Sequence, residues 1–494
     1  MEDWRCSGVC LLDYVPVNLR IRVLFDRMRG LACCLVWWAA SASAALLADE
    51  RAICADMERF FLEEDADRRE EIARGIEADP AYNRAKVRDW LHRAGFFEPM
   101  DPGRVCIRVS LDDGGALPVT IRVPRGYDPR RPYPLIYALH GTAGTGDAII
   151  DYAERLLGDE AEQFVVAAPT GYQQVVIHAS TPPSSEHMAV LQAIRRSVHI
   201  RADRIYALGY SRGGHAAWTL AVVHPGEFAG ILPIAGTLIL PDPDALFEVF
   251  VPNIASTRVF TCWGENDIMS ADYATPSQHG GIAGLNRRVC TLAAGLNLPI
   301  TWFEVPDKGH EYIEPPREDL RALLSMERQA YPPRFLHVFR FACQGYTPWI
   351  EPHAWRGPWW EAKPLQLSFR DDENPSDPAT QRAALTRAVR GRLGELRGEI
   401  NGQIIRVYRK KISELTVWIG DGMIDWDQPA ILNVNGRVAF EGKLAPDLAV
   451  CLTQAARTYD FDRLRWAGLR FKSGSRTRVI TSQTPFPRPP AIPE

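Results

Sequence analysis

The sequence has few of the features that mark metal sites, nucleic-acid binding or repeat architecture. Its 494 residues include 10 cysteines, and none is spaced as a Cys-x-x-Cys pair or with histidines as a zinc site requires. The 57 basic and 61 acidic residues nearly cancel, so the net charge of −4 gives no electrostatic reason to expect a nucleic-acid partner. No internal repeat is present. The remaining composition, 46% hydrophobic and 24% charged, is typical of globular domains, and the length predicts two or three.

Long apolar runs are also scarce, and the one that stands out lies near the N-terminus. Four arginines between residues 20 and 29 precede the apolar run Leu31–Ala40, and Ala42-Ser43-Ala44 offers the small residues that signal peptidase accepts. Residues 1–44 are therefore expected to be a signal peptide or anchor region, which predicts a secreted, periplasmic or cell-envelope protein. One alternative is an uncleaved anchor, which is the only membrane contact that the sequence leads us to expect. The other alternative is a buried helix.

Cysteine pairing stays open at this stage. Six cysteines lie beyond the expected cleavage point: Cys54, Cys106, Cys262, Cys290, Cys343 and Cys451. An oxidising compartment would allow disulfides, but a chain of this length does not need them, so buried free thiols are an equal alternative.

Residues 101–330 alternate short apolar runs with helical segments. The expected strands cover residues 119–124, 135–141, 164–169, 205–209, 230–236, 258–264 and 301–305. Continuous apolar strands separated by helices predict an α/β fold with a mostly parallel sheet and helices on both faces. In such a sheet, functional residues gather at the C-terminal ends of the strands.

The flanking regions differ in character. Residues 45–100 carry apolar residues at helical spacing and predict a helical segment that packs on the main domain or forms a stalk. Residues 331–494 contain runs typical of antiparallel strands and predict a smaller β-rich accessory domain. Within it, Asn435-Gly436 predicts a tight hairpin turn. Its tryptophans at 355, 359 and 360 are expected to fill a core or a contact, with stacking on sugar rings as the alternative.

The stretch Gly209-Tyr210-Ser211-Arg212-Gly213 fits the pattern G-x-S-x-G between an expected strand and an expected helix. A strand that runs straight into a helix forces its turn residue into a strained conformation, and the flanking glycines leave room for it. A serine hydroxyl is a weak nucleophile that needs a base and oxyanion donors. We therefore expect Ser211 to be a catalytic nucleophile.

The partners of such a serine follow two later strands. Asp267 comes directly after the strand at 258–264, and His310 comes after the strand at 301–305. This order predicts His310 as general base and then acid, and Asp267 as the group that fixes its tautomer. His279 competes with His310. The carboxylates of Glu265, Asp272 and Asp307 compete with Asp267.

The oxyanion hole is expected to use two backbone N–H groups. Arg212 N–H opens the helix after the serine, where free donors favour negative charge. The second donor is expected from His140-Gly141-Thr142, with Thr142 preferred over Gly141, and His140 is expected to brace the loop. The side chain of Arg212 forms a helix-surface salt bridge or, as the alternative, contacts an acidic group of the substrate.

This region resembles the α/β-hydrolase superfamily. The resemblance covers residues 105–325 and depends on the serine turn, the His140-Gly141 loop and the positions of the Asp and His residues. The chain is similar to its secreted esterase branch (feruloyl and acetylxylan esterases, polyhydroxybutyrate depolymerases) and to the catalytic domain of prolyl oligopeptidases. The resemblance implies a serine hydrolase with an acyl-enzyme mechanism, no cofactor and no metal. It does not specify a substrate.

Three functions are compatible with these residues. The first is an exported serine esterase that acts on small or polymeric carboxylic esters. The second is a serine peptidase of the prolyl-oligopeptidase type. The third is a non-catalytic binding protein on a hydrolase scaffold, which a complete triad disfavours. The oligomeric state is not indicated by the sequence.

Overall fold

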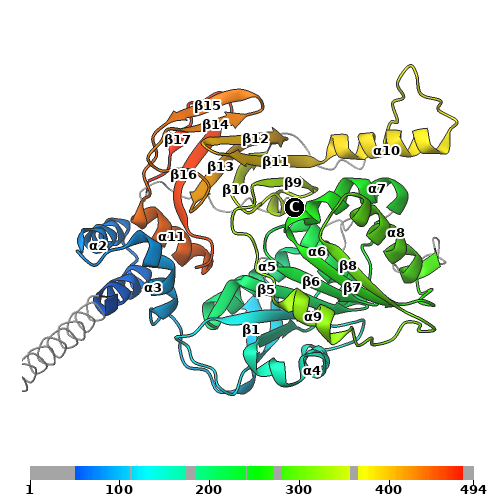
Figure 1. Cartoon of the computed structure of the whole chain (residues 1–494), viewed down its shortest axis with the longest axis horizontal. Coiled ribbons are helices and arrows are strands. Elements are labelled where there is room, and N and C mark those ends of the chain that lie inside the picture. The colour runs from blue at the N-terminus through cyan, green and yellow to red at the C-terminus, as the bar shows by residue number, and fades with distance from the viewer. Residues whose placement is uncertain are drawn as a thin grey trace, which may run out of the picture.

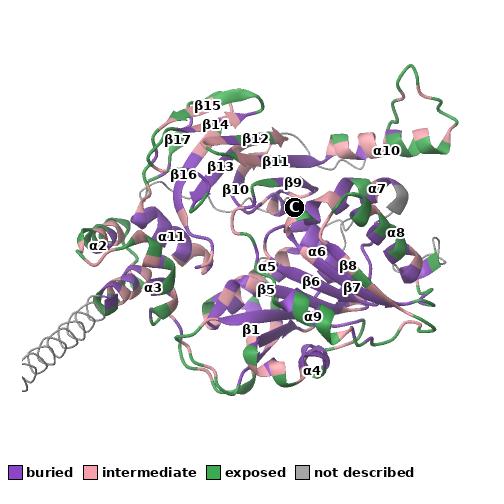
Figure 2. Cartoon of the chain, viewed as in Figure 1, coloured by how far each residue is buried: buried purple, intermediate pink, exposed green. Residues whose placement is uncertain are grey.

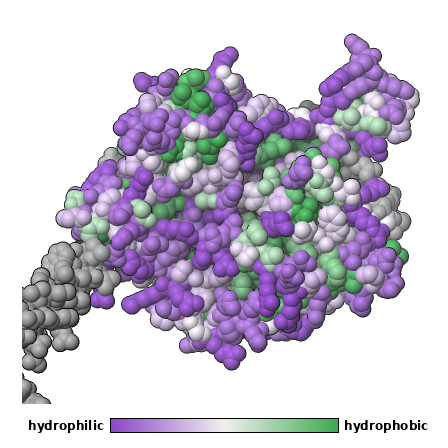
Figure 3. Space-filling model, in the orientation of Figure 1, coloured by the Kyte–Doolittle hydropathy of each residue, from purple (hydrophilic) through white to green (hydrophobic). Residues whose placement is uncertain are grey.

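The computed structural model describes residues 50–111, 114–173, 175, 184–240, 242–270, 280–355 and 365–481. These residues form an eight-stranded sheet, a five-stranded sheet and a four-stranded sheet, together with the helices that cover them (Figure 1). The expected signal or anchor region, residues 1–44, lies outside these ranges. Within them, no helix is both long enough and apolar enough to span a membrane. The face drawn in Figure 3 is mostly hydrophilic, with separate smaller apolar areas.

The eight-stranded sheet has the order β1-β2-β4-β3-β5-β6-β7-β8. Every neighbouring pair from β4 to β8 is parallel, whereas β1–β2 and β2–β4 are antiparallel. The predicted α/β fold with a mostly parallel sheet is therefore confirmed. Its strands are β1 (Gly103–Ser110), β2 (Ala116–Val123), β3 (Tyr133–Leu139), β4 (Val165–Pro169), β5 (Ile200–Tyr210), β6 (Gly230–Ile234), β7 (Arg258–Gly264) and β8 (Ile300–Val305). Its helices are α4 (Gly146–Leu157), α5 (Ser184–Ser197), α6 (Arg212–Val223), α7 (Pro243–Phe250), α8 (Gly281–Gly295) and α9 (Arg317–Leu324).

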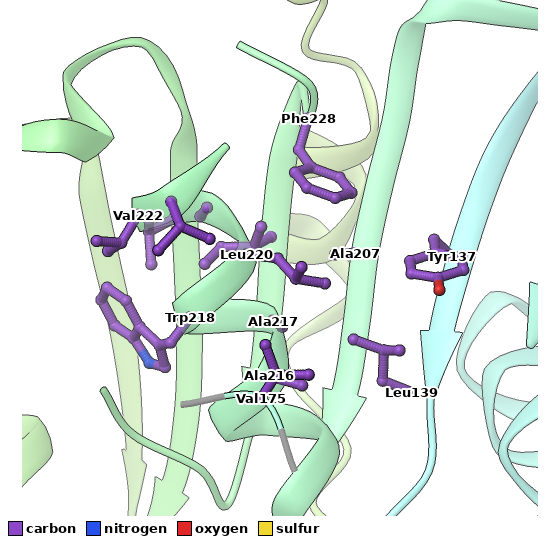
Figure 4. Packing of buried hydrophobic residues seen from close by; sticks show 14 of the residues in the cluster. Tyr137, Leu139, Val175, Ala207, Ala216, Ala217, Trp218, Leu220, Val222 and Phe228 are labelled. Carbon is purple, nitrogen blue, oxygen red and sulfur yellow. The ribbon is translucent and has the colours of Figure 1, made fainter. Parts of the chain in front are cut away.

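Both faces of this sheet are buried. Successive residues of β3 point to opposite faces, so Tyr137 and Leu139 join one apolar cluster while Ile136 and Ala138 join the other. Figure 4 shows the first cluster, in which α6 packs Trp218 and its apolar neighbours beside β3 and β5. Because α6 begins directly after β5, this packing fixes the turn between them.

The two C-terminal sheets have the orders β15-β14-β12-β11-β9 and β10-β13-β16-β17. Asn435 and Gly436 have φ angles of 50° and 80° in the β14–β15 turn, as the hairpin prediction requires. The elements are β9 (Arg334–Phe339), β10 (Ile350–Trp355), α10 (Pro378–Arg392), β11 (Gly394–Asn401), β12 (Ile404–Lys410), β13 (Ile412–Gly420), β14 (Ala430–Val434), β15 (Arg437–Gly442), α11 (Leu448–Thr458), β16 (Arg465–Lys472) and β17 (Arg478–Val479).

One pairing in this region corrects the expectation of antiparallel strands, since β12 and β14 are parallel. Lys411, with a φ of 62°, directs the chain from β12 into β13 of the other sheet, so the chain returns to β14 in the same direction. Trp355 is partly buried, and its ring meets Phe339 edge to face with centroids 5.3 Å apart. This fits the expected core role. Trp359 and Trp360 lie outside the described residues.

The N-terminal helices α2 (Ala66–Ala78) and α3 (Val87–Arg93) pack mainly on the C-terminal part of the chain. Their apolar faces form one cluster with α11 and with Trp466 of β16, and their outer faces are exposed (Figure 2). The eight-stranded sheet contributes polar contacts such as Arg88 to Asp203 at 2.8 Å. The expected helical segment is present, but its main apolar partner is not the central sheet, because the apolar residues of α11 complete its core.

All six cysteines in the described residues are free thiols. Cys262, Cys290 and Cys451 are buried, and this burial raises the pKa of each thiol above its ordinary value. A thiol that stays protonated is a poor nucleophile, so these residues act as small apolar side chains.

Buried ion pairs join the α/β sheet to the C-terminal part. Arg328 donates to both carboxylate oxygens of Asp460 at 2.9 Å, and Arg195 contacts Glu227 at 2.7 Å. Arg463 lies 3.6 Å from Glu227 and donates to the carbonyl of Gly226. Burial alone would raise the pKa of Glu227, but the charges of Arg195 and Arg463 lower it to about 2. The carboxylate is therefore ionised at neutral pH and contributes to stability there.

Acidification is expected to weaken this junction. Because the pKa of Glu227 is lower in the folded than in the unfolded chain, its contribution is complete above its ordinary value of 4.5 and is lost as the pH falls toward about 2. Asp460, whose pKa is also lowered despite its burial, acts in the same direction. We expect the midpoint of urea unfolding to fall across this window.

The matched variants are Glu227→Gln and Glu248→Gln, the latter at an exposed position on α7. Glu227→Gln should be less stable than the wild type at pH 7, with a difference that shrinks as the pH falls below 4.5, because the unfolded wild-type chain then binds a proton at this carboxyl that the folded chain does not. Glu248→Gln should follow the wild type. Equal pH profiles for all three proteins would contradict this assignment.

Candidate active site

Ser211 occupies the turn between β5 and α6. Its φ of 53° and ψ of −116° are strained for a residue with a side chain, as a serine between a strand and a helix requires. A Cβ on Gly213 would overlap the carbonyl oxygen of Leu139, and a Cβ on Gly209 would overlap the backbone of Gly213. Glycine is needed at both positions because α6 lies so close to the ends of β3 and β5.

The loops after β7 and β8 are held against each other. Asn266 N–H donates to the carbonyl of Lys308 at 2.8 Å, and a Cβ on Gly264 would overlap that same carbonyl. Asp267 follows in the first loop and His310 in the second. This pairing of loops places the carboxylate next to the imidazole.

The structure brings the three expected side chains into one chain of hydrogen bonds. Ser211 Oγ lies 2.8 Å from His310 Nε2, and His310 Nδ1 lies 2.9 Å from Asp267 Oδ2. Ser211 and Asp267 are 4% and 0% exposed. The buried carboxylate accepts from Nδ1–H, so Nε2 is left with its lone pair toward the serine hydroxyl. This arrangement can take a proton from Ser211 during a nucleophilic attack.

The expected oxyanion donors border the serine. Arg212 is the first residue of α6, where backbone N–H groups have no partner within the helix. Gly141, which precedes Thr142, lies so close that a Cβ on it would be 3.5 Å from Ser211 Cβ. The loop of Gly141 and Thr142 therefore lies beside the reacting hydroxyl.

His140 is buried and holds this loop in place, as expected. Its Nε2 accepts from Gly171 N–H at 3.3 Å, its Nδ1–H lies 2.7 Å from the Gly141 carbonyl, and its own carbonyl accepts from Tyr172 Oη at 2.6 Å. Burial lowers the pKa of His140 below its ordinary value. A neutral ring can both donate and accept, which these contacts require.

The competing residues are placed differently. Glu265 Oε2 accepts from Asp307 N–H at 3.1 Å, so this carboxylate braces the histidine loop rather than the imidazole. Asp307 has a φ of 59° in a tight turn, and among the described contacts its carboxylate does not reach His310. Asp272 and His279 lie outside the described residues.

The expected salt bridge of Arg212 is wrong for the part of the chain that the structure describes. Its Nη2 donates to the carbonyl of Tyr172 at 3.1 Å, and its guanidinium lies 4.8 Å from the centre of the Tyr172 ring. Within the described ranges, no carboxylate lies at ion-pair distance from it. The reason is the loop after β4, which places an aromatic ring and a carbonyl where a surface helix would meet an acidic side chain.

Two tyrosines near the site were not anticipated from the sequence. Tyr210 stacks on Tyr312 with ring centroids 3.8 Å apart, and the Tyr210 ring lies 5.7 Å from the ring of His310. Tyr210 directly precedes Ser211, and Tyr312 is two residues after His310, so their position beside the site could have been inferred from the sequence. Across the described ranges, no group of His, Cys, Asp and Glu side chains is arranged to hold a metal.

Part of the chain is similar in sequence to known esterases. Residues 114–273 match a family described as "Putative esterase", a range that includes Ser211 and Asp267. The chain is 24% identical over 187 residues to Feruloyl esterase C of Emericella nidulans, an alignment covering 37% of this chain and 59% of that protein. It is 30% identical over 125 residues to "Putative esterase NocK" of Nocardia uniformis, covering 23% of this chain and 35% of that protein.

A solved structure described as a thermostable esterase is 20% identical, with a TM-score of 0.36, and the match covers 46% of this chain and 63% of that one. The chain thus spans little more than half of Feruloyl esterase C and about a third of NocK. The matched part carries an esterase-like sequence on an α/β-hydrolase fold.

Proposed function

We propose that this esterase-like α/β-hydrolase cleaves carboxylic esters through an acyl-enzyme, with residues 101–330 as catalytic domain and 331–494 as accessory domain. The observation that carries the proposal is the continuous hydrogen-bond chain Ser211–His310–Asp267, with distances of 2.8 Å and 2.9 Å. Ser211 and Asp267 lie within the residues that match the esterase family, and the neighbours of Ser211 supply candidate oxyanion donors.

The first half of the reaction acylates the enzyme. Ser211 Oγ attacks the ester carbonyl carbon while its proton moves to His310 Nε2, and the carbonyl oxygen becomes an oxyanion. The N–H groups of Arg212 and Thr142, with Gly141 as the alternative to Thr142, donate to this oxyanion. Asp267 stabilises the imidazolium. The tetrahedral intermediate then expels the alcohol, which takes the proton from His310 Nε2.

The second half releases the acid. His310 Nε2 accepts a proton from water as the water attacks the acyl-enzyme carbonyl, and a second tetrahedral intermediate forms in the same donor site. Its collapse breaks the bond to Ser211 Oγ, which recovers its proton from His310. No cofactor is needed for these steps.

Fluorophosphonate labelling with peptide mapping, together with turnover of unactivated esters and aminoacyl-anilides, tests the proposal. We expect covalent labelling at Ser211 and hydrolysis of methyl esters, with methyl ferulate included because three relatives carry the name feruloyl esterase. Activated esters are unsuitable here because peptidases also cleave them. Labelling with cleavage of anilides alone would favour the peptidase, and an unlabelled Ser211 would overturn both enzymatic functions.

We further propose that the protein is exported, on the basis of the arginines and the apolar run before residue 44. N-terminal sequencing of the protein recovered from its native host tests this. A mature chain that begins shortly after Ala44 supports export with cleavage, and a mature chain that retains the apolar run in a soluble cytoplasmic fraction contradicts it.

A further inference from the structure

Arg212 places a positive charge beside the nucleophile, and the part of the chain that the structure describes gives it no acidic partner. Of its five N–H donors, the structure pairs one with the carbonyl of Tyr172, at 3.1 Å. Its Nε is buried and has no acceptor, and the residue as a whole is half-buried. The guanidinium also lies 4.8 Å from the centre of the Tyr172 ring and interacts with the Tyr172 hydroxyl. Among the described residues, no carboxylate pairs with the remaining donors of this side chain.

The described histidines near Arg212 do not compensate its charge. Its histidine neighbours are neutral, since burial and then nearby charges, including that of Arg212, lower the pKa of His187 to about 3. Burial similarly lowers the pKa of His140. A partly desolvated cation without a partner is unfavourable in the free protein.

Two other shielded arginines, Arg122 and Arg195, are paired with carboxylates. Arg122 donates to Glu154 at 2.9 Å and contacts Glu162 at 2.6 Å, and Arg195 contacts Glu227 at 2.7 Å. Both are buried more deeply than Arg212. The contrast shows that burial in this fold does not itself prevent pairing, whereas the described residues at the active-site edge provide no carboxylate for Arg212.

We propose that Arg212 binds an anionic group of the substrate, so that the preferred esters carry a carboxylate close to the scissile bond. This inference rests on the proposed function. The backbone N–H of Arg212 is a candidate oxyanion donor. Its side chain therefore starts on a residue that would contact the reacting carbonyl of the substrate. A guanidinium forms strong charge-assisted hydrogen bonds with a carboxylate, and the aromatic face of Tyr172 fixes its plane.

Matched pairs of esters test this proposal. On the acyl side, the monoester of 4-nitrophenol with adipic acid is compared with 4-nitrophenyl hexanoate, which replaces the terminal carboxylate by a methyl group. On the alcohol side, 4-acetoxybenzoate is compared with 4-acetoxybenzamide. The measured quantity is the ratio of kcat/KM for the anionic ester to kcat/KM for its neutral partner, at low and at high salt.

For the wild type we expect this ratio to exceed one in at least one pair and to decrease with salt, because screening weakens an attraction between charges. In Arg212→Gln the ratio should fall about 10- to 100-fold, the range for a hydrogen bond between charged groups. Arg212→Lys should retain most of the preference. Arg155→Gln removes an exposed arginine that also lies over a tyrosine, 5.7 Å from the ring of Tyr152, and should leave the ratio unchanged.

The outcomes separate this inference from the proposed function. Hydrolysis of the neutral esters with no preference in either pair, or an unchanged ratio in Arg212→Gln, overturns the role of Arg212 and leaves the esterase proposal intact. A ratio that falls equally in Arg155→Gln also overturns it, since net charge alone would then explain the preference. Absence of Ser211 labelling and of all ester turnover overturns both.

Discussion

Ser211→Ala is expected to reduce kcat for ester hydrolysis by about 10⁴- to 10⁶-fold, the range observed when a triad nucleophile is removed. Without Oγ no acyl-enzyme can form, and His310 Nε2 loses the hydroxyl that lies 2.8 Å away. The melting temperature should stay close to that of the wild type, because the substitution removes one oxygen atom and no apolar contact. Steady-state kinetics and a thermal scan of the purified variant measure both quantities.

Ser325→Ala is the control, since this serine is exposed at the end of α9 and its hydroxyl donates to the carbonyl of Ala322. It should keep wild-type kcat and wild-type labelling by a fluorophosphonate. If Ser211→Ala retained turnover and labelling, the nucleophile would be another residue, and the proposed mechanism would be wrong.

Asp267→Asn is expected to lower kcat by about 10⁴-fold. The amide can donate to His310 Nδ1, which stabilises the tautomer with its proton on Nε2. That tautomer cannot accept the proton of Ser211. Because Asp267 is fully buried and its Oδ1 also accepts weakly from Met269 N–H at 3.3 Å, the isosteric amide should keep the loop folded. The loss should appear in kcat at neutral pH, measured with a saturating neutral ester.

Glu265→Gln provides the matched control two residues away. Its carboxylate accepts from Asp307 N–H, a contact that the amide oxygen of glutamine can also make. We expect kcat close to that of the wild type. A severe loss in Glu265→Gln together with an active Asp267→Asn would identify Glu265 as the acidic partner of His310.

Much of the α/β sheet could be predicted because its signal is local. Strands buried on both faces are continuous apolar runs, and the run at 258–264 coincides with β7 as the structure has it. The juxtaposition of Ser211, Asp267 and His310 was expected from one topological rule, that residues following parallel strands meet at one edge. The strand β1 was missed because its exposed alternate residues interrupt the apolar pattern.

The rest depends on contacts between distant segments. The charge on Arg212 could be seen in the sequence, but its position over Tyr172 depends on a loop 40 residues earlier in the chain. Helix α11 lies in a region expected to be β-rich. Its apolar pattern is short, and it indicates a helix only once its packing on α2 and α3 is known. The parallel pairing of β12 with β14 follows from a change of sheet at Lys411. The hydrophobic periodicity of the sequence does not indicate this change.

The contact of α2 and α3 with α11 has a consequence for biosynthesis. Their shared cluster joins residues from Ile53 to Phe97 with residues from Leu448 to Trp466. Helices α2 and α3 therefore keep an uncovered apolar face until α11 and β16 have been translated. Domains generally fold as they emerge, N-terminal part first, but this cluster forms only after both C-terminal segments have left the ribosome. A nascent chain that stalls before residue 448 should consequently be a chaperone client.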